Sequence, residues 1–381
     1  MITRRNVVAL LASAIGAPAV TTARGAPAAT TARAKEKRSC ADDQRPALRE
    51  LAGPKDLVIG SAMSLYELNA DDRRLFSREL AGITPENALK MGSIRPTQDV
   101  WRFEEADALL DFAEEAKVRV RGHTLIWNND LQPAWIQALS EAEIRAVMQE
   151  HIELTMSRYE GRVKIWDVVN EPIGTEEHGP YSLRDGPFLA RLGPDYIAES
   201  FRMARKVAPD AKLVLNETHT ERDDRFGLDY RRNLLFLIDR LQEAGVPIDG
   251  VGLQGHLQSA VRFDLDAYGQ FLTEISNRKL FIELTEIDVN DEDFSDDENS
   301  RDKQVADFYR RYLDCVLANR AVKSVTFWQL GDKASWYFER SVREEPKSKR
   351  RPRPLLFDLR MRPKPALFAV IDALRAMPQR G

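Results

Sequence analysis

Apolar residues follow two alternating patterns between about residue 55 and residue 375. One pattern consists of short, almost continuously apolar segments, which are typical of strands buried on both faces of a parallel sheet. The other repeats every three or four residues, as in amphipathic helices. The predicted strands cover residues 57–63, 83–86, 118–127, 163–171, 212–217, 250–257, 280–289 and 322–330. The predicted helices cover residues 71–80, 104–116, 140–159, 195–207, 228–244, 265–277, 303–319 and 366–374.

The two patterns alternate eight times along the chain. Connections that contain a whole helix are long enough to join parallel neighbouring strands. Eight successive strand–helix units favour a closed barrel over an open doubly wound sheet. The sequence therefore predicts an α/β fold, a single (β/α)8 TIM barrel with its active site at the C-terminal ends of the strands. We expect this domain over residues 55–378, after a polar leader over 31–54.

The N-terminal residues have the composition of a targeting segment. Arg4 and Arg5 precede an apolar, alanine-rich run over 7–20, and the small residues over 21–34 suit cleavage by a signal peptidase. We therefore expect an export signal and linker over 1–30, and a periplasmic or extracellular protein. The paired arginines favour the twin-arginine route over an ordinary secretory signal, which also begins with basic residues.

Composition limits the classes of partner. The chain has a formal net charge of −4 and no basic stripe, which argues against nucleic acid as a ligand. It has no uninterrupted apolar run of about 18 residues, so no membrane-spanning helix is expected. We expect a monomer that acts on a polysaccharide or oligosaccharide, for the reasons given below.

Cysteine and histidine usage provides no sign of a metal centre. Cys40 lies in the polar leader and Cys315 in a helical pattern. An oxidising compartment would permit a disulfide between them, but their settings favour two unpaired thiols. No Cys/His cluster has metal-ligand spacing and no glycine-rich loop suits a phosphate, so neither a metal nor another cofactor is expected.

Hydrogen-bonding and aromatic side chains gather where the predicted strands end. If only one strand end carried such a residue, the simplest interpretation would be structural: a polar group with its hydrogen bonds satisfied, or an aromatic ring packed in the core. A rim that only packed would carry apolar residues, so seven strand ends of this kind indicate a ligand site. In chain order they are Glu86, Asn87, His123, Trp127, Asn170, Glu171, Asn216, Glu217, Gln254, His256, Glu286, Asp288 and Trp328, with Asp332 and Trp336 shortly after.

This mixture of side chains suits a sugar, which has apolar ring faces and a belt of hydroxyl groups. Two carboxylates in such a site are the apparatus of glycoside hydrolysis. Glu171 ends the fourth predicted strand and Glu286 lies in the seventh, so the two should face each other across the barrel. A separation of roughly 5–5.5 Å between their carboxyl groups would indicate a retaining, double-displacement mechanism.

With these residues in place, the sequence resembles the endo-β-1,4-xylanases of glycoside hydrolase family 10. The resemblance extends in order over about residues 55–375. Its segments are TPEN (84–87) with Lys90, RGHTLIW (121–127), WDVVNE (166–171), GLQGHL (252–257), LTEID (284–288), Trp328 with DKASW (332–336), LLFD (355–358) and KPA (364–366).

The resemblance implies a role for each matching residue. Glu171 corresponds to the acid/base and Glu286 to the nucleophile. Repulsion by an ionised Glu286 should keep Glu171 protonated until the sugar esterifies Glu286, after which Glu171 can act as a base. His256 would hold Glu286, and Asn170 would bond the sugar 2-hydroxyl. The other implied substrate-binding residues are Asn87, Lys90, His123 and Trp127 on the non-reducing side, Gln254, Trp328 and Trp336 in the reacting subsite, and Glu86.

The sequence departs from the family pattern beside these residues. Met91 stands where tryptophan is usual, and the segment 128–130 (Asn-Asn-Asp) replaces a histidine with a nearby glutamine. Glu217 and Thr218 stand where Asp-Tyr is usual, and Gln329 replaces a glycine. We expect these changes to affect the distal subsites rather than the two catalytic glutamates.

The sequence therefore predicts a secreted retaining endo-β-1,4-xylanase that hydrolyses internal bonds of xylan through a covalent glycosyl-enzyme. One alternative is a retaining β-1,4-glucanase or xylo-oligosaccharide hydrolase with the same two glutamates. Another is a catalytically inactive carbohydrate-binding protein, against which the presence of Glu171, Glu286, Asn170 and His256 argues.

Overall fold

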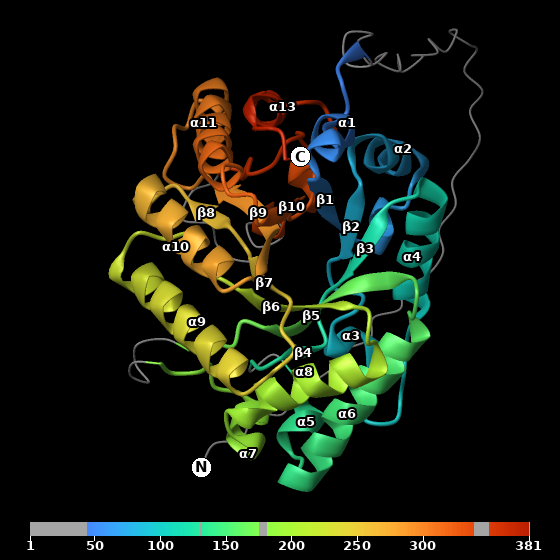
Figure 1. The fold of residues 1–381 in the computed structure, drawn as a ribbon. Helices are drawn as coiled ribbons and strands as arrows, with labels where there is room; N and C mark the ends of the chain where they lie inside the picture. Colours follow the sequence, from blue (N-terminus) through green and yellow to red (C-terminus); the bar gives the residue numbers. More distant parts are fainter. Residues whose placement is uncertain (1–43, 130–131, 175–180, 339–349, 381) are drawn as a thin grey trace, which may run out of the picture. The chain divides into compact units, whose positions relative to one another are not determined.

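Parallel strands close into a barrel in the computed structural model, which describes residues 44–129, 132–174, 181–338 and 350–380 (Figure 1). The last barrel strand, β10, pairs with both β9 and β1, which closes the ring. The predicted (β/α)8 fold is thereby confirmed. In ring order the eight barrel strands are β1 (Val58–Met63), β2 (Gly82–Pro85), β3 (Arg119–Gly122), β5 (Val163–Asn170), β6 (Lys212–Glu217), β7 (Gly250–Leu253), β9 (Phe281–Asn290) and β10 (Val322–Phe327).

Helices form the outer layer around this ring (Figure 1). The longer ones are α2 (Ala70–Glu79), α4 (Glu104–Ala116), α6 (Glu141–Arg158), α8 (Asp195–Val207), α9 (Arg225–Glu243), α10 (Leu265–Asn277), α11 (Glu298–Val316) and α13 (Pro365–Ala376). Shorter helices lie in the connections: α1 (Leu48–Ala52), α3 (Met91–Ile94), α5 (Ala134–Gln137), α7 (Pro187–Leu192), and the 3-10 turns η2 (Gly53–Lys55), η3 (Leu65–Glu67) and η5 (Asp332–Ala334). None of the described helices is long and apolar enough to cross a membrane.

Side-chain caps set several helix starts. Ser140 and Glu143 form the expected capping box, in which the Ser140 N–H donates to the Glu143 carboxylate over 2.8 Å. Helix α11 begins at Glu298, five residues before the predicted start at 303, because Asp297 accepts a hydrogen bond from the Ser300 N–H over 2.9 Å.

The predicted strand over 118–127 is interrupted. It divides into β3 and the short β4 (Ile126–Trp127), which also pairs with β5. Between them the Thr124 hydroxyl and the Leu125 N–H both donate to the Asp167 carbonyl, at 2.9 and 3.0 Å. The chain therefore bends around one acceptor, a feature that an apolar run does not reveal.

The predicted strand over 250–257 is interrupted as well. It divides into β7 and β8 (His256–Gln258), and β8 pairs beyond the end of β7 with Asp288–Asn290 of β9. Gly255 lies between them with φ = +75°, a left-handed conformation that glycine adopts without steric cost. This turn brings His256 beside Asp288.

The barrel unit begins earlier than the boundary expected at residue 55. It starts at Arg45, and α1 contributes the buried side chains of Leu48 and Ala52 to the core. Arg45 forms two hydrogen bonds of 2.8 and 3.0 Å with the buried carboxylate of Glu79. The last residues of the expected polar leader are therefore part of the outer layer. The expected export signal and Cys40 lie outside the described residues.

Gly122 provides a test of packing between the ring and its outer layer. It lies opposite Trp166 in the β3–β5 register, and an added Cβ would be 2.1 Å from the indole ring. Trp166 is fully buried, so it has no space to move. We expect Gly122→Ala to lower the free energy of unfolding by about 1–3 kcal/mol or more, measured by denaturant unfolding.

Gly53→Ala is the matched control for this prediction. No heavy atom lies within 4 Å of a Cβ at position 53, so that variant should unfold at the wild-type denaturant concentration. Equal unfolding midpoints for both variants would show that the contact between Gly122 and Trp166 is not tight.

Candidate active site

Backbone hydrogen bonds join four neighbouring strands near one rim of the barrel. The Glu171 N–H donates to the Asn216 carbonyl over 2.8 Å. The Gln254 N–H donates to the Glu217 carbonyl, and the Glu286 N–H to the Gln254 carbonyl, each over 2.9 Å. Parallel strands that end in register carry their terminal side chains to the same rim. The rim thus brings together the side chains that sequence reasoning selected.

Glu171 accepts hydrogen bonds from two uncharged donors. Gln254 Nε2 donates to Oε1 over 2.8 Å, and Trp127 Nε1 donates to Oε2 over 3.2 Å. The Glu171 backbone is left-handed, with φ = +50°, directly after β5. Strained non-glycine residues of this kind are concentrated at functional sites. Both contacts orient the carboxyl group, so Trp127 and Gln254 act on Glu171 in addition to any contact with a sugar.

Sequence reasoning missed one residue of this site, Arg184. Its guanidinium Nη2 lies 3.2 Å from Glu171 Oε2, and its Nε donates to the Glu171 carbonyl over 2.9 Å. Although burial lowers the pKa of Arg184, the negative charges of Glu171 and Glu217 outweigh burial and raise it. Arg184 lies in the irregular segment before α7, where no periodicity or strand end marks its position.

Glu286 has a different environment. Asn216 Nδ2 donates to its Oε1 over 2.8 Å, and His256 Nε2 lies 3.5 Å from its Oε2. Burial alone would raise the pKa of Glu286. The hydrogen bond from His256 and the positive charges of His123, His256 and Lys90 outweigh burial and lower this pKa to about 2. Glu286 is therefore ionised at neutral pH.

His256 links Glu286 to a second carboxylate. Its Nδ1 lies 2.8 Å from Asp288 Oδ1, while Trp336 Nε1 donates to Asp288 Oδ2 over 2.8 Å. Burial would lower the pKa of His256, but Asp288 and Glu286 raise it well above the ordinary value. A protonated His256 between two carboxylates agrees with its predicted function of holding Glu286 in the charged form.

Asn216 also fixes the residue that precedes the predicted acid/base. Its Nδ2 donates to Asn170 Oδ1 over 2.8 Å, in addition to Glu286, and its Oδ1 accepts from the Thr285 hydroxyl over 2.8 Å. These contacts leave the Asn216 amide a single orientation. Asn216 was selected from the sequence as a strand-end residue, but its position in the sequence did not indicate that it would contact Glu286.

The wall toward β2 and β10 carries the remaining predicted residues. Lys90 Nζ donates to Asn87 Oδ1 over 2.9 Å and lies 5.2 Å from the ring centroid of Trp127 and 6.0 Å from that of Trp328. Burial lowers the pKa of Lys90, while Glu286, Glu86 and Glu171 oppose this effect. Lys90 therefore lies between two aromatic faces and close to three carboxylates.

His123 is only 2% exposed, as buried as Gln254, another of the predicted sugar-binding residues. Its Nδ1 lies 2.9 Å from Asp167 Oδ2, and its ring packs edge-on against Trp328 with centroids 5.4 Å apart. This leaves Nε2 as the atom that could reach a sugar.

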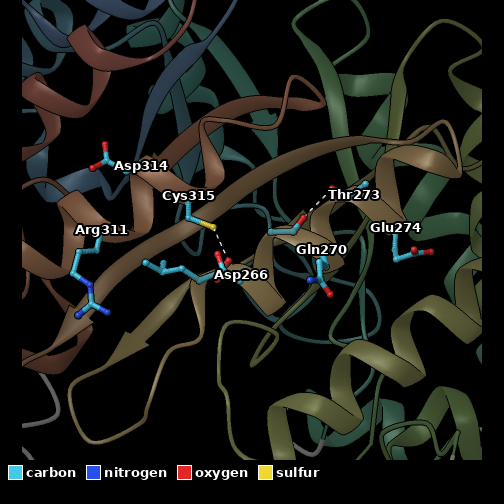
Figure 2. A pocket seen from close by; sticks show the side chains of 9 residues that line it. Asp266, Gln270, Thr273, Glu274, Arg311, Asp314 and Cys315 are labelled. Carbon is cyan, nitrogen blue, oxygen red and sulfur yellow. Dashed lines mark hydrogen bonds between the residues drawn. The ribbon is translucent and has the colours of Figure 1, made fainter.

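A separate hollow lies on the outer surface between α10 and α11 (Figure 2). Acidic side chains and Arg311 surround it, and the Cys315 thiol donates to the Leu265 carbonyl over 3.2 Å. Burial raises the pKa of Cys315 to about 11, so the thiol is protonated and a poor nucleophile at neutral pH. The groups that contact the two glutamates lie at the barrel rim and not here.

Glu217 is a fully buried carboxyl group behind Glu171. Its oxygens accept from the N–H groups of Ile173 and Thr218, at 3.0 and 2.9 Å. Burial raises its pKa from the ordinary 4.5 to about 8, against the opposing charge of Arg184. The unfolded chain therefore releases this proton at lower pH than the folded protein does. The resulting loss of stability grows as pH rises from about 4.5 to about 8.

We expect Glu217→Gln to reduce the decline in melting temperature between pH 5 and pH 8. Glutamine preserves the size of the side chain and removes the titrating proton. Glu105→Gln, which changes an exposed glutamate on α4, is the matched control and should keep the wild-type slope. If both variants have the same slope, Glu217 is not the group responsible.

Comparison with known proteins agrees with the geometry. The model of glycosyl hydrolase family 10 matches residues 47–373. Endo-1,4-beta-xylanase B of Thermotoga neapolitana is 32% identical over 337 residues, which are 86% of this chain and 91% of that protein.

Two solved structures extend the similarity to the fold. Native xylanase 10B from Thermotoga maritima is 33% identical with a TM-score of 0.77. Xylanase 10B from Thermotoga petrophila RKU-1, in complex with xylobiose, is 32% identical with a TM-score of 0.78. Each similarity covers 87% of this chain and 98% of the other. With its closed barrel and a family match over most of its length, the protein is a glycosidase and belongs to glycosyl hydrolase family 10.

Proposed function

We propose that the protein is a retaining endo-β-1,4-xylanase that hydrolyses internal bonds of xylan. The observation that carries the proposal is the contrast between the two glutamates. Glu286 is held as a carboxylate by His256 and Asn216, whereas Glu171 accepts hydrogen bonds from neutral Gln254 and Trp127 and has one cationic neighbour, Arg184, at 3.2 Å. Two carboxyl groups with different environments suit an acid and a nucleophile. The xylanase names of the relatives support xylan as the substrate.

In the first step, a Glu286 oxygen attacks the anomeric carbon of the sugar. The bond from that carbon to the linking oxygen breaks, and Glu171 donates its proton to that oxygen. The negative charge of Glu286 repels negative charge on Glu171. Asn170, held by Asn216, binds the sugar 2-hydroxyl, and Lys90 binds hydroxyl groups on the non-reducing side.

In the second step, Glu171 removes a proton from water, and the water oxygen attacks the anomeric carbon and releases Glu286. Esterification has removed the charge of Glu286, so its repulsion is gone. Arg184 Nη2, 3.2 Å from Glu171 Oε2, contacts the carboxyl group that accepts this proton.

Export is a further part of the proposal. The basic and apolar residues over 1–30 suit an export signal, and xylan is a polymer too large to enter a cell. The enzyme is proposed to act as a monomer in the periplasm or outside the cell.

The purified protein should release a mixture of xylo-oligosaccharides from xylan, and much less reducing sugar from carboxymethylcellulose. Glu286→Ala should lower turnover on every substrate by roughly 10³-fold or more, because no glycosyl ester can form. Reducing-end assays and a product profile on a branched xylan measure both expectations.

Glu292→Ala, at an exposed position shortly after β9, is the control for Glu286→Ala and should keep wild-type turnover. Equal or faster hydrolysis of carboxymethylcellulose by the wild type would instead favour a β-1,4-glucanase. Binding of xylo-oligosaccharides without release of reducing ends would favour an inactive carbohydrate-binding protein.

Glu171→Ala should separate substrates by their leaving groups. General acid catalysis typically contributes about 10²–10⁴-fold, so kcat/KM on xylan should fall by that order. An aryl xylobioside with an acidic phenol needs little protonation, so its kcat/KM should fall far less. Equal losses on both substrates would contradict the acid assignment.

A further inference from the structure

Gln329 has a backbone conformation that normally requires glycine. It follows Trp328 at the end of β10, its φ is +87°, and its side chain is fully buried. A side chain at such a φ is disfavoured because its Cβ approaches the backbone. The family that the sequence resembles usually has glycine here. In this chain a glutamine occupies the position although its backbone conformation is strained.

The Gln329 amide contacts Glu86 directly. Its Nε2 donates to Glu86 Oε2 over 2.7 Å, and the Ser64 hydroxyl donates to the same oxygen over 2.7 Å. Gln329 Nε2 also lies 3.4 Å from Ser64 Oγ. One oxygen of Glu86 is thus held by two donors, while Oε1 has no hydrogen-bond partner among the residues that the structure describes.

These three residues come from neighbouring strands. Gln329 follows β10, Ser64 follows β1 and Glu86 follows β2, and the ring order is β10, β1, β2. We name them the Ser64–Glu86–Gln329 cluster. It adjoins the reacting subsite through Trp328, the residue before Gln329, and through Lys90, which is close enough to Glu86 and Glu286 to respond to both charges.

Glu67 supports the cluster from behind without adding a negative charge. The Ser64 N–H donates to Glu67 Oε2 over 2.8 Å, and the Glu67 side chain is fully buried. Burial raises the pKa of Glu67 to about 8, so the group is mostly uncharged at neutral pH. Glu86 is the partly exposed carboxyl group of this corner.

We infer that Gln329 is a positioning residue that directs Glu86 Oε1 toward the second sugar on the non-reducing side of the scissile bond. With Oε2 held by Gln329 and Ser64, the free Oε1 is aimed at a sugar hydroxyl before the substrate binds. The glutamine thus strengthens binding of that sugar unit. The inference rests on the proposed function and adds a substrate-positioning residue to it.

Two aryl glycosides test this inference, one carrying a single xylose and the other carrying xylobiose. On this inference, only the bioside has a sugar unit that reaches Glu86. We expect Gln329→Gly to lower kcat/KM on the bioside about ten-fold, the effect of losing a hydrogen bond to a charged group. On the monoside, kcat/KM should stay within about two-fold of the wild type. The loss should appear mainly in KM.

Two further variants accompany Gln329→Gly, one that should enlarge the effect and one that is a control. Gln329→Glu places a carboxylate against Glu86 and should lower the ratio of bioside to monoside efficiency further. Lys117→Gly is the matched control because Lys117 also has a positive φ, +55°, at the end of α4. It relieves the same kind of strain away from the rim and should leave the ratio unchanged.

An unchanged ratio in Gln329→Gly, or an equal fall on both glycosides, would overturn the inference. If Gln329→Gly does not fold, Ser64→Ala removes the other donor to Glu86 Oε2 and should lower the same ratio; an unchanged ratio there overturns the inference as well. If the wild type hydrolyses neither glycoside, the proposed function itself fails, and the two failures are thereby distinguished.

Discussion

A buried arginine inside the barrel holds together the strand that leads to Glu171 and the strand that carries Glu286. Arg121 Nε donates to Asp167 on β5 over 3.0 Å, and its Nη1 donates to Glu283 on β9 over 3.1 Å. All three side chains are at most 4% exposed. An unpaired charge in this position would be costly, so the three groups must stay together. Asp167 lies four residues before Glu171, and Glu283 lies three before Glu286.

Above this charged layer, the rim gives the two glutamates different surroundings. His256, Lys90 and His123 place positive charge around Glu286, whereas Glu171 has two neutral donors and one arginine at its edge. The difference arises from which strand ends are neighbours. A site made of side chains on rigid barrel strands can hold both environments at one rim.

The repeating apolar pattern was enough to predict the barrel and the strand ends at Glu171 and Glu286. It did not show that the predicted strands over 118–127 and 250–257 are each interrupted. Those breaks depend on a carbonyl acceptor on another strand, Asp167, and on a left-handed Gly255. Arg184 escaped notice for a related reason, since an irregular loop has no period from which a contact can be inferred.

The sequence by itself determined the fold class, the rim and the chemical types gathered there, because strand periodicity and strand ends are local properties of the chain. Only the tertiary structure decided which polar group meets which. Asn216 bonds Glu286, Arg184 pairs with Glu171, and Gln329 holds Glu86. Each of these contacts joins segments that are distant in sequence, and its length depends on strand register and backbone conformation, which no local pattern encodes.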